Sequence, residues 1–128
     1  MFKRFFKSEQ QKLIEFAVKI LEDKENNEVR ANAAGFDQPQ KVKRVSTNEF
    51  YFPDITAKKS NQFRIFSVET KQTLHDRETL KRWKLFSEFA KQNNALFFIA
   101  FPVGLTADIQ KTLQESGIEA QLWELTKK

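Results

Sequence analysis

The first part of the chain carries apolar residues at helical spacing. This spacing predicts a helix from Phe2 to about Asp23, with one apolar stripe on its buried side. Glu9 lies within that stripe, and Glu15 lies beside it, closer to the polar face. The stripe consists of Phe2, Phe5, Phe6, Leu13, Phe16, Ala17, Ile20 and Leu21.

A short alternating segment and a long polar stretch follow the helix. The alternation of residues Glu28–Ala34 predicts a strand. Residues 35–49 form the longest irregular stretch of the chain, and Val42 and Val45 leave open a short extra strand within it. Loops of this length are uncommon in compact domains and often have a function.

The middle of the chain reads as two strands joined by a polar turn. The first strand covers Phe50–Ala57, the turn covers Lys58–Gln62, and the second strand begins at Phe63 and runs through Lys71. Three charged residues stand in these otherwise apolar strands, namely Asp54, Glu69 and Lys71. Because desolvating a charge is costly, we expect each of them to have a partner or a metal ion.

The last third of the chain predicts two helices and two strands. Asp76 is expected to cap a helix that ends near Asn93, and Thr106 a helix that ends at Ser116 before Gly117. The apolar run Ala95–Phe101 is typical of a strand covered on both faces, and Ile118–Leu125 alternates as a final strand.

The order of these elements predicts the fold class. It is helix, strand, a two-stranded hairpin, helix, strand, helix, strand, or α-β-β-β-α-β-α-β. A hairpin followed by strand–helix–strand crossovers predicts an α/β domain with a mixed central sheet flanked by helices. At 128 residues, the chain is expected to form one domain, residues 1–128.

Composition narrows the setting of this domain. Hydrophobic residues make up 40% of the chain and include 14 Phe, so it should fold. The absence of cysteine excludes disulfides and thiolate metal sites. No apolar run is long enough to span a bilayer, and the charged N-terminus does not resemble a signal peptide. A cytoplasmic location is therefore expected, with no membrane partner.

Charge is unevenly distributed along the chain. The net charge is +5, and residues 37–94 alone carry twelve basic and seven acidic side chains, a surplus of five. A basic surplus around a candidate site favours a polyanionic partner, although a solvated lysine-rich surface explains the same count.

The charged residues of the hairpin suggest metal chemistry. Glu69 and Lys71 are two apart on a strand and therefore share a face, and Asp54 lies on the neighbouring strand. Two nearby carboxylates repel each other unless a cation intervenes. Mg²⁺ is often held by one or two carboxylates together with substrate phosphates, and a lysine beside it can help to activate water. These are the parts needed to hydrolyse a phosphodiester.

At Pro53-Asp54 and Glu69-Thr70-Lys71 the chain resembles the PD-(D/E)xK nucleases, which have the restriction-endonuclease-like fold. The resemblance covers roughly residues 9–102. In layout it is nearest to small Holliday-junction resolvases and virus-type replication-repair nuclease modules. It implies that Asp54, Glu69 and the Thr70 carbonyl bind the metal and that Lys71 assists the water. Many members add a carboxylate from the first helix, for which Glu9 is expected and Glu15 is the reserve.

The sequence therefore predicts a Mg²⁺- or Mn²⁺-dependent endonuclease that acts on DNA, including branched DNA. The alternatives are a non-catalytic module on the same fold that binds nucleic acid or a protein, and a structural domain whose hairpin charges form an ion network. A homodimer is also expected, with Phe2, Phe5, Phe6, Trp123 and Leu125 offering apolar surface. The residues expected to contact phosphates are Lys41, Lys43, Arg44, Lys58, Lys59, Lys81 and Lys84.

Overall fold

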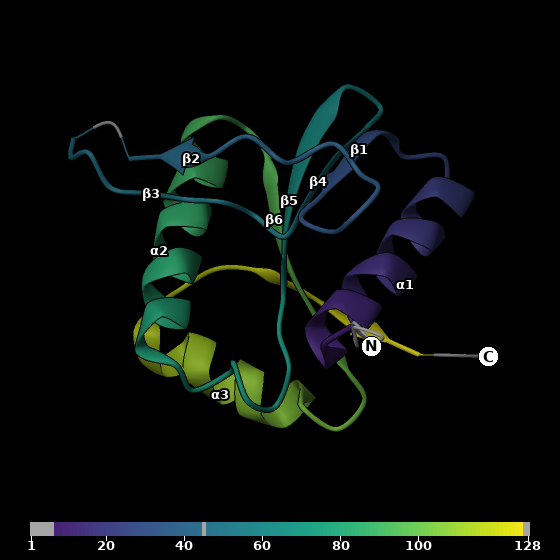
Figure 1. The fold of residues 1–128 in the computed structure, drawn as a ribbon. Coiled ribbons are helices and arrows are strands. Elements are labelled where there is room, and N and C mark those ends of the chain that lie inside the picture. The colour runs from purple at the N-terminus through teal and green to yellow at the C-terminus, as the bar shows by residue number, and fades with distance from the viewer. Residues whose placement is uncertain (1–6, 45, 127–128) are drawn as a thin grey trace, which may run out of the picture.

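A computed structural model describes residues 7–44 and 46–126 of the chain (Figure 1). One helix, α1 (Glu9–Asp23), packs on one face of a central sheet. Two helices, α2 (Arg77–Gln92) and α3 (Thr106–Ser116), pack on the other face. The expected apolar residues Phe2, Phe5 and Phe6 lie outside the described part of the chain.

The central sheet has five strands in the spatial order β1-β4-β5-β6-β7. The strands β1 (Asn27–Ala31), β4 (Ile55–Lys59) and β5 (Gln62–Val68) form an antiparallel meander. Next to them β6 (Leu96–Pro102) and β7 (Gln121–Leu125) run parallel to β5. The prediction of an α/β chain with a mixed sheet flanked by helices is thus confirmed.

A second, two-stranded sheet interrupts the meander. The strands β2 (Val42–Lys43) and β3 (Phe50–Tyr51) pair with each other and pack on α2. The short extra strand left open at Val42 therefore exists, whereas Val45 lies outside the described residues. The prediction of one continuous strand over Phe50–Ala57 is wrong, because β3 ends at Tyr51 and β4 begins at Ile55. Pro53 stands in the gap, where it cannot donate a ladder hydrogen bond.

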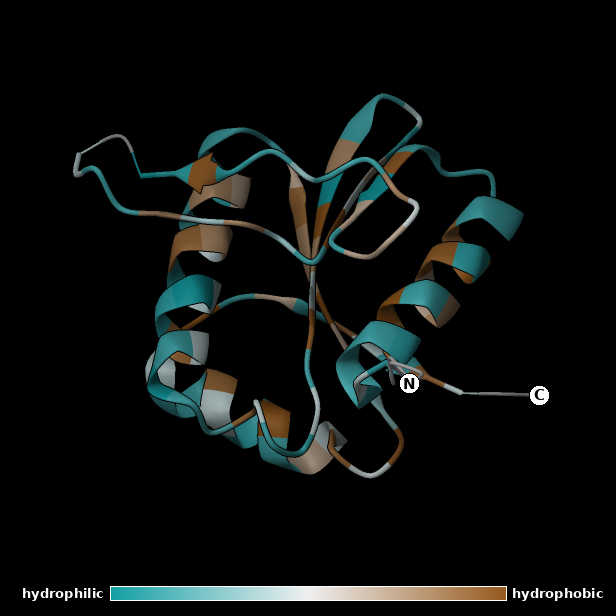
Figure 2. Cartoon of the chain, in the orientation of Figure 1, coloured by the Kyte–Doolittle hydropathy of each residue, from teal (hydrophilic) through white to brown (hydrophobic). Residues whose placement is uncertain are grey.

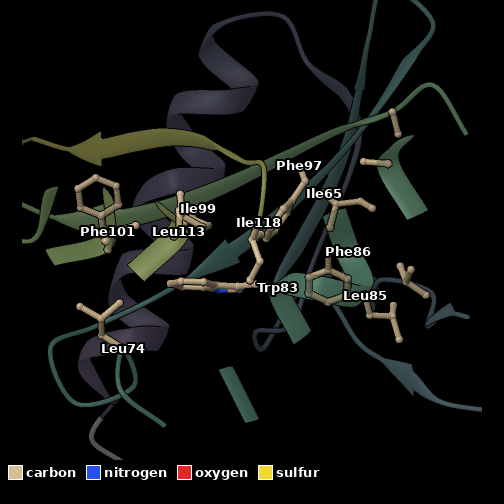
Figure 3. Close-up of a cluster of buried hydrophobic side chains, with 14 residues drawn as sticks. Ile65, Leu74, Trp83, Leu85, Phe86, Phe97, Ile99, Phe101, Leu113 and Ile118 are labelled. Carbon is tan, nitrogen blue, oxygen red and sulfur yellow. The ribbon is translucent and has the colours of Figure 1, made fainter. Parts of the chain in front are cut away.

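Each face of the central sheet carries its own hydrophobic core. On the α2 face, the Trp83 indole lies among side chains from β5, β6, α2 and α3 (Figure 3). On the α1 face, Phe66 stacks on Phe98 and packs edge to face against Trp123. All three helices show hydrophilic bands alternating with hydrophobic ones, as expected of helices that cover a sheet (Figure 2).

The ends of the elements test several sequence predictions. Asp76 caps α2, because its side chain accepts a hydrogen bond from the Glu78 amide. Gly117 follows α3 with a φ of 66°, the left-handed conformation that glycine adopts without strain. Thr106 is the first residue of α3 rather than its cap, and its hydroxyl donates to Glu124 instead.

The edge strand β7 bears on the expected homodimer. Leu125 is buried in the α1-side core, and Trp123 is partly buried there, so neither is the freely exposed apolar surface that was expected. The homodimer stays a prediction. In the part of the chain that the structure describes, none of the helices has the length and apolar character needed to cross a bilayer.

Candidate functional site

Asp54 and Glu69 lie at the same end of the β4–β5 hairpin. Ile55 pairs with Phe66, and both of these side chains belong to the α1-side core. Because side chains alternate along a strand, Asp54 and Glu69 fall on the opposite face, under α2. The charge of Glu69 contributes to raising the pKa of Asp54, which agrees with this placement.

The Glu69 carboxylate is completely enclosed by protein. Its exposed fraction is 0%, and four side chains donate hydrogen bonds to it. The Ser67 hydroxyl lies 2.6 Å and the Trp83 indole nitrogen 3.1 Å from Oε2. The Thr73 hydroxyl lies 2.7 Å from Oε1, and the Arg82 guanidinium forms an ion pair at 3.2 Å from Oε2. Each oxygen therefore has at least two donors, which offset the cost of burying the charge.

The chain turns directly after Glu69. β5 ends at Val68, and the Thr70 amide donates to the Thr73 hydroxyl at 2.8 Å. The Thr70 carbonyl accepts from the Leu74 amide at 3.1 Å. Lys71 therefore lies in a turn with its side chain exposed. The prediction that it continues the strand and shares a face with Glu69 is wrong, because hydrogen bonds between Thr70 and Thr73 end the extended backbone.

Asp54 has far fewer partners than Glu69. Its Oδ2 accepts one hydrogen bond, from the Val68 amide at 2.7 Å. Burial is the main cause that raises the pKa of Asp54 from 3.8 to about 7, and the charge of Glu69 adds to this rise. The hydrogen bond from the Val68 amide and the charge of Arg82 oppose it. At neutral pH this carboxyl group therefore exchanges readily between its charged and neutral forms.

The first helix presents an amide to this end of the sheet instead of a carboxylate. The Gln10 side chain donates to the Val68 carbonyl at 3.0 Å. Glu9 is exposed, and Glu15 forms an ion pair with Lys7 at 2.8 Å, so the expectation that Glu9 faces the sheet is wrong. The buried residues of α1 are Ile14, Ala17, Val18 and Leu21. This stripe is rotated by one residue from the predicted one, and it includes position 10 rather than 9.

The residues present do not fit the Mg²⁺ site that the resemblance implies. A hard cation needs accessible oxygen ligands. Glu69 already accepts hydrogen bonds from four side chains, and the Thr70 carbonyl accepts one from the Leu74 amide. Glu9 is exposed and does not face the sheet. Asp54 accepts a described hydrogen bond at Oδ2 alone, so it has one oxygen left, but it is a single carboxylate. Across residues 7–44 and 46–126, no three acidic, histidine or cysteine side chains are grouped so as to hold a metal ion.

The basic residues expected to contact phosphates fall into two groups. Four are exposed and form no ion pair with the carboxylates that the structure describes: Lys41, Lys43, Lys81 and Lys84. Arg44 instead joins Glu49 at 3.2 Å and Glu88 of α2 at 3.1 Å, which fixes β2 on the helix.

The two lysines at the β4–β5 turn lie at the far end of the hairpin from Asp54. At about 3.3 Å per strand residue, Lys58 lies about 13 Å along β4 from Asp54. Lys58 pairs with Glu28 at 3.4 Å, and Lys59 turns to the α1 face beside Trp123. Arg30, which sequence reasoning missed, lines a hollow with Lys58 and Gln40. The four exposed lysines without a described ion pair therefore lie in or beside β2 and on α2.

Sequence reasoning also missed the residues that enclose Glu69. Ser67 could have been found, because it lies two residues before Glu69 on the same face of β5. Arg82 stands between Lys81 and Trp83 and looks like one more exposed cation until α2 is packed on the sheet. Comparisons with protein-family models, with curated proteins and with solved structures found no match.

Proposed function

We propose that this chain is a nucleic-acid-binding domain in which Glu69 has a structural role. The observation that carries the proposal is the group of four exposed lysines, Lys41, Lys43, Lys81 and Lys84, around the junction of α2 with the β2–β3 ribbon. The order of the meander, α2 and β6 supports a restriction-endonuclease-like arrangement of the core, which the resemblance at Pro53-Asp54 and Glu69-Thr70-Lys71 implies.

The arrangement of charges around α2 supports this role. Glu78 and Glu88 both contact the ribbon, through Tyr51 and Arg44. Lys81 lies three residues after Glu78 and seven before Glu88, so it falls on the same side of the helix. The carboxylates on this side are engaged by protein partners, whereas the lysines are not. An anionic polymer would therefore meet free cations here without displacing an internal ion pair.

Binding of labelled DNA in the presence of a chelator tests the proposal. Binding should survive chelation and weaken steeply with salt, because lysines that neutralise phosphates release counterions. Changing Lys41, Lys43, Lys81 and Lys84 to Gln should reduce the salt dependence by about one unit of slope for each phosphate that is no longer neutralised. A quadruple Lys12→Gln, Lys19→Gln, Lys24→Gln, Lys111→Gln variant at or beside α1 and α3 removes the same number of exposed charges and is the matched control. Absence of binding, or equal losses in both variants, would contradict the proposal.

A second candidate, the metal-dependent nuclease, is favoured by Asp54. This residue has an oxygen without a described donor, and burial raises its pKa to about 7. Incubating plasmid and branched DNA with Mg²⁺ or Mn²⁺ tests this candidate. Cleavage that is abolished in Asp54→Asn, while DNA binding persists, would establish it. Binding without cleavage would leave the binding domain as the function.

A further inference from the structure

The outer surface of the β2–β3 ribbon combines two aromatic and two basic side chains. In the ribbon, Val42 pairs with Tyr51 and Lys43 pairs with Phe50. Val42 is buried and Tyr51 packs against the α2-side core, so this pair faces inward. By alternation Lys43 and Phe50 face outward, and continuing the same register places Lys41 beside Phe52. We name these four residues, Lys41, Lys43, Phe50 and Phe52, the ribbon face.

The aromatic rings of the ribbon face are unusually accessible. Phe50 is 45% and Phe52 is 53% exposed, and Val103 is the only other large hydrophobic residue so exposed among those that the structure describes. The two rings meet edge to face with centroids 5.8 Å apart. The Lys41 ammonium lies 4.7 Å from the centre of the Phe50 ring, so a cation is held directly against the aromatic surface.

The charge of this surface is positive and available. Lys41 and Lys43 form no ion pair with a described carboxylate. The neighbouring Glu49 is engaged by Arg44 and by the Thr47 hydroxyl. A ligand that matches the ribbon face therefore carries negative charge next to flat apolar groups. Single-stranded nucleic acid has this chemistry, because its bases expose their faces while its phosphates remain charged.

We propose that the ribbon face binds unpaired nucleotides, with Phe50 and Phe52 stacking on bases and Lys41 and Lys43 contacting phosphates. This inference rests on the proposed function and specifies its substrate class. A duplex satisfies the lysines as well as a single strand does, but it hides its base faces within the stack. The aromatic residues therefore confer a preference for single strands, single-stranded ends or loops.

Fluorescence anisotropy with a labelled single strand of roughly 20 nucleotides, and with its duplex, tests the inference in a chelating buffer. The double variant Phe50→Leu, Phe52→Leu keeps apolar side chains but removes the aromatic faces. It should lose at least about tenfold in affinity for the single strand, because base–aromatic stacking supplies a large share of single-strand affinity. Its affinity for the duplex should stay within about twofold. The variant Phe50→Tyr, Phe52→Tyr keeps both rings and should retain wild-type preference.

The possible failures are distinguishable. If the Leu variant binds single strands as well as the wild type does, the inference is wrong and the proposed function stands on the lysines. If the Leu and Tyr variants lose affinity equally, stacking is not the cause and the inference is again wrong. If the wild type binds neither oligonucleotide, both proposals fail. Unchanged thermal unfolding of each variant confirms that the fold is retained.

Discussion

The charged group of the Glu69 site is buried, whereas the charged groups of the ribbon face are exposed. Glu69 is inaccessible and receives hydrogen bonds from four side chains, whereas Lys41 and Lys43 are exposed and form no ion pair with described carboxylates. A buried charge with a complete set of donors stabilises a fold but has little capacity left for a ligand. An exposed charge contributes little to stability and remains free to bind. The comparison separates the part of the molecule that holds it together from the part that faces a partner.

The largest effect should come from removing the enclosed carboxylate. Glu69→Ala leaves two buried donors, Ser67 and Trp83, without their acceptor, together with the partly buried Arg82 and Thr73, so we expect the free energy of unfolding to fall by about 3–5 kcal/mol. Glu69→Gln keeps one acceptor oxygen and should lose less. Urea unfolding measures both. If Glu69 were held in place for a metal, Glu69→Ala would leave the metal-free protein equally stable or more stable. That result would contradict a structural role for Glu69.

Asp54 should make stability depend on pH. Because folding raises the pKa of Asp54 from 3.8 to about 7, its neutral form is favoured in the folded state. The stability that the neutral carboxyl group contributes is fully present below the pKa of Asp54 in the unfolded chain, 3.8. It is lost as the pH rises through the pKa in the folded state, about 7. Asp54→Asn should therefore raise the free energy of unfolding by up to about 4 kcal/mol at pH well above 7.

The Asp54→Asn measurement requires a chelator, because a bound cation would itself lower the pKa of Asp54. The amide oxygen of Asn can still accept from the Val68 amide, so the substitution isolates the charge. The gain should disappear below the unfolded pKa, where wild-type Asp54 is neutral in both states. A gain that is equal at low and high pH would show that the charge is not its cause.

Thr73 allows a finer test of the enclosure. Its hydroxyl donates to Glu69 and accepts from the Thr70 amide, so Thr73→Val removes one donor and one acceptor from a partly buried network. We expect a loss of about 2 kcal/mol in chemical unfolding. Thr73→Ser keeps the hydroxyl and should lose less than about 1 kcal/mol. Equal losses in the two variants would attribute the effect to packing rather than to hydrogen bonding.

The smallest effect on stability is expected at the ribbon face. Phe52→Ala removes a ring that is 53% exposed, so the free energy of unfolding should fall by less than about 1 kcal/mol. Phe66→Ala is the matched control, since this ring is 1% exposed and its loss should cost about 3–5 kcal/mol. A large destabilisation by Phe52→Ala in thermal unfolding would mean that the ribbon face belongs to the structural part of the molecule.

Much of the fold could be predicted from the sequence because local signals agree with the tertiary structure. The Asp76 cap, the apolar run that became β6 and the alternation of the hairpin each predicted their element. The sequence also predicted that Asp54 and Glu69 lie on neighbouring strands of one hairpin. These signals are carried by residues close together in the chain, so no knowledge of packing was needed.

The misplaced site residues depend on interactions that the pattern does not contain. In α1, apolar residues lie on both sides of the buried stripe, so the sequence fits two helix orientations that differ by one residue. In one orientation Glu9 faces the sheet, and in the other, which the structure has, Gln10 faces it. Lys71 was misplaced because hydrogen bonds between Thr70 and Thr73 end the strand. Threonine is common in strands, so the composition of this segment gave no sign of the turn. The enclosure of Glu69 requires α2 to be docked on the sheet, which no local pattern shows.

The hydrogen bond between the Asn32 amide and the Asp54 carbonyl, 2.9 Å long, has a consequence for evolution. It closes the chain segment 32–54 at its base, directly beside the pairing of Ala31 with Ile55. Doubling the length of such a closed segment costs only about 0.6 kcal/mol in loop entropy. The outward-facing positions of the ribbon can therefore change among descendants while β1 and β4 keep their register and Val42 and Tyr51 keep their packing on the α2-side core. Selection for a new ligand can act on these outward-facing positions and leave the two cores unchanged.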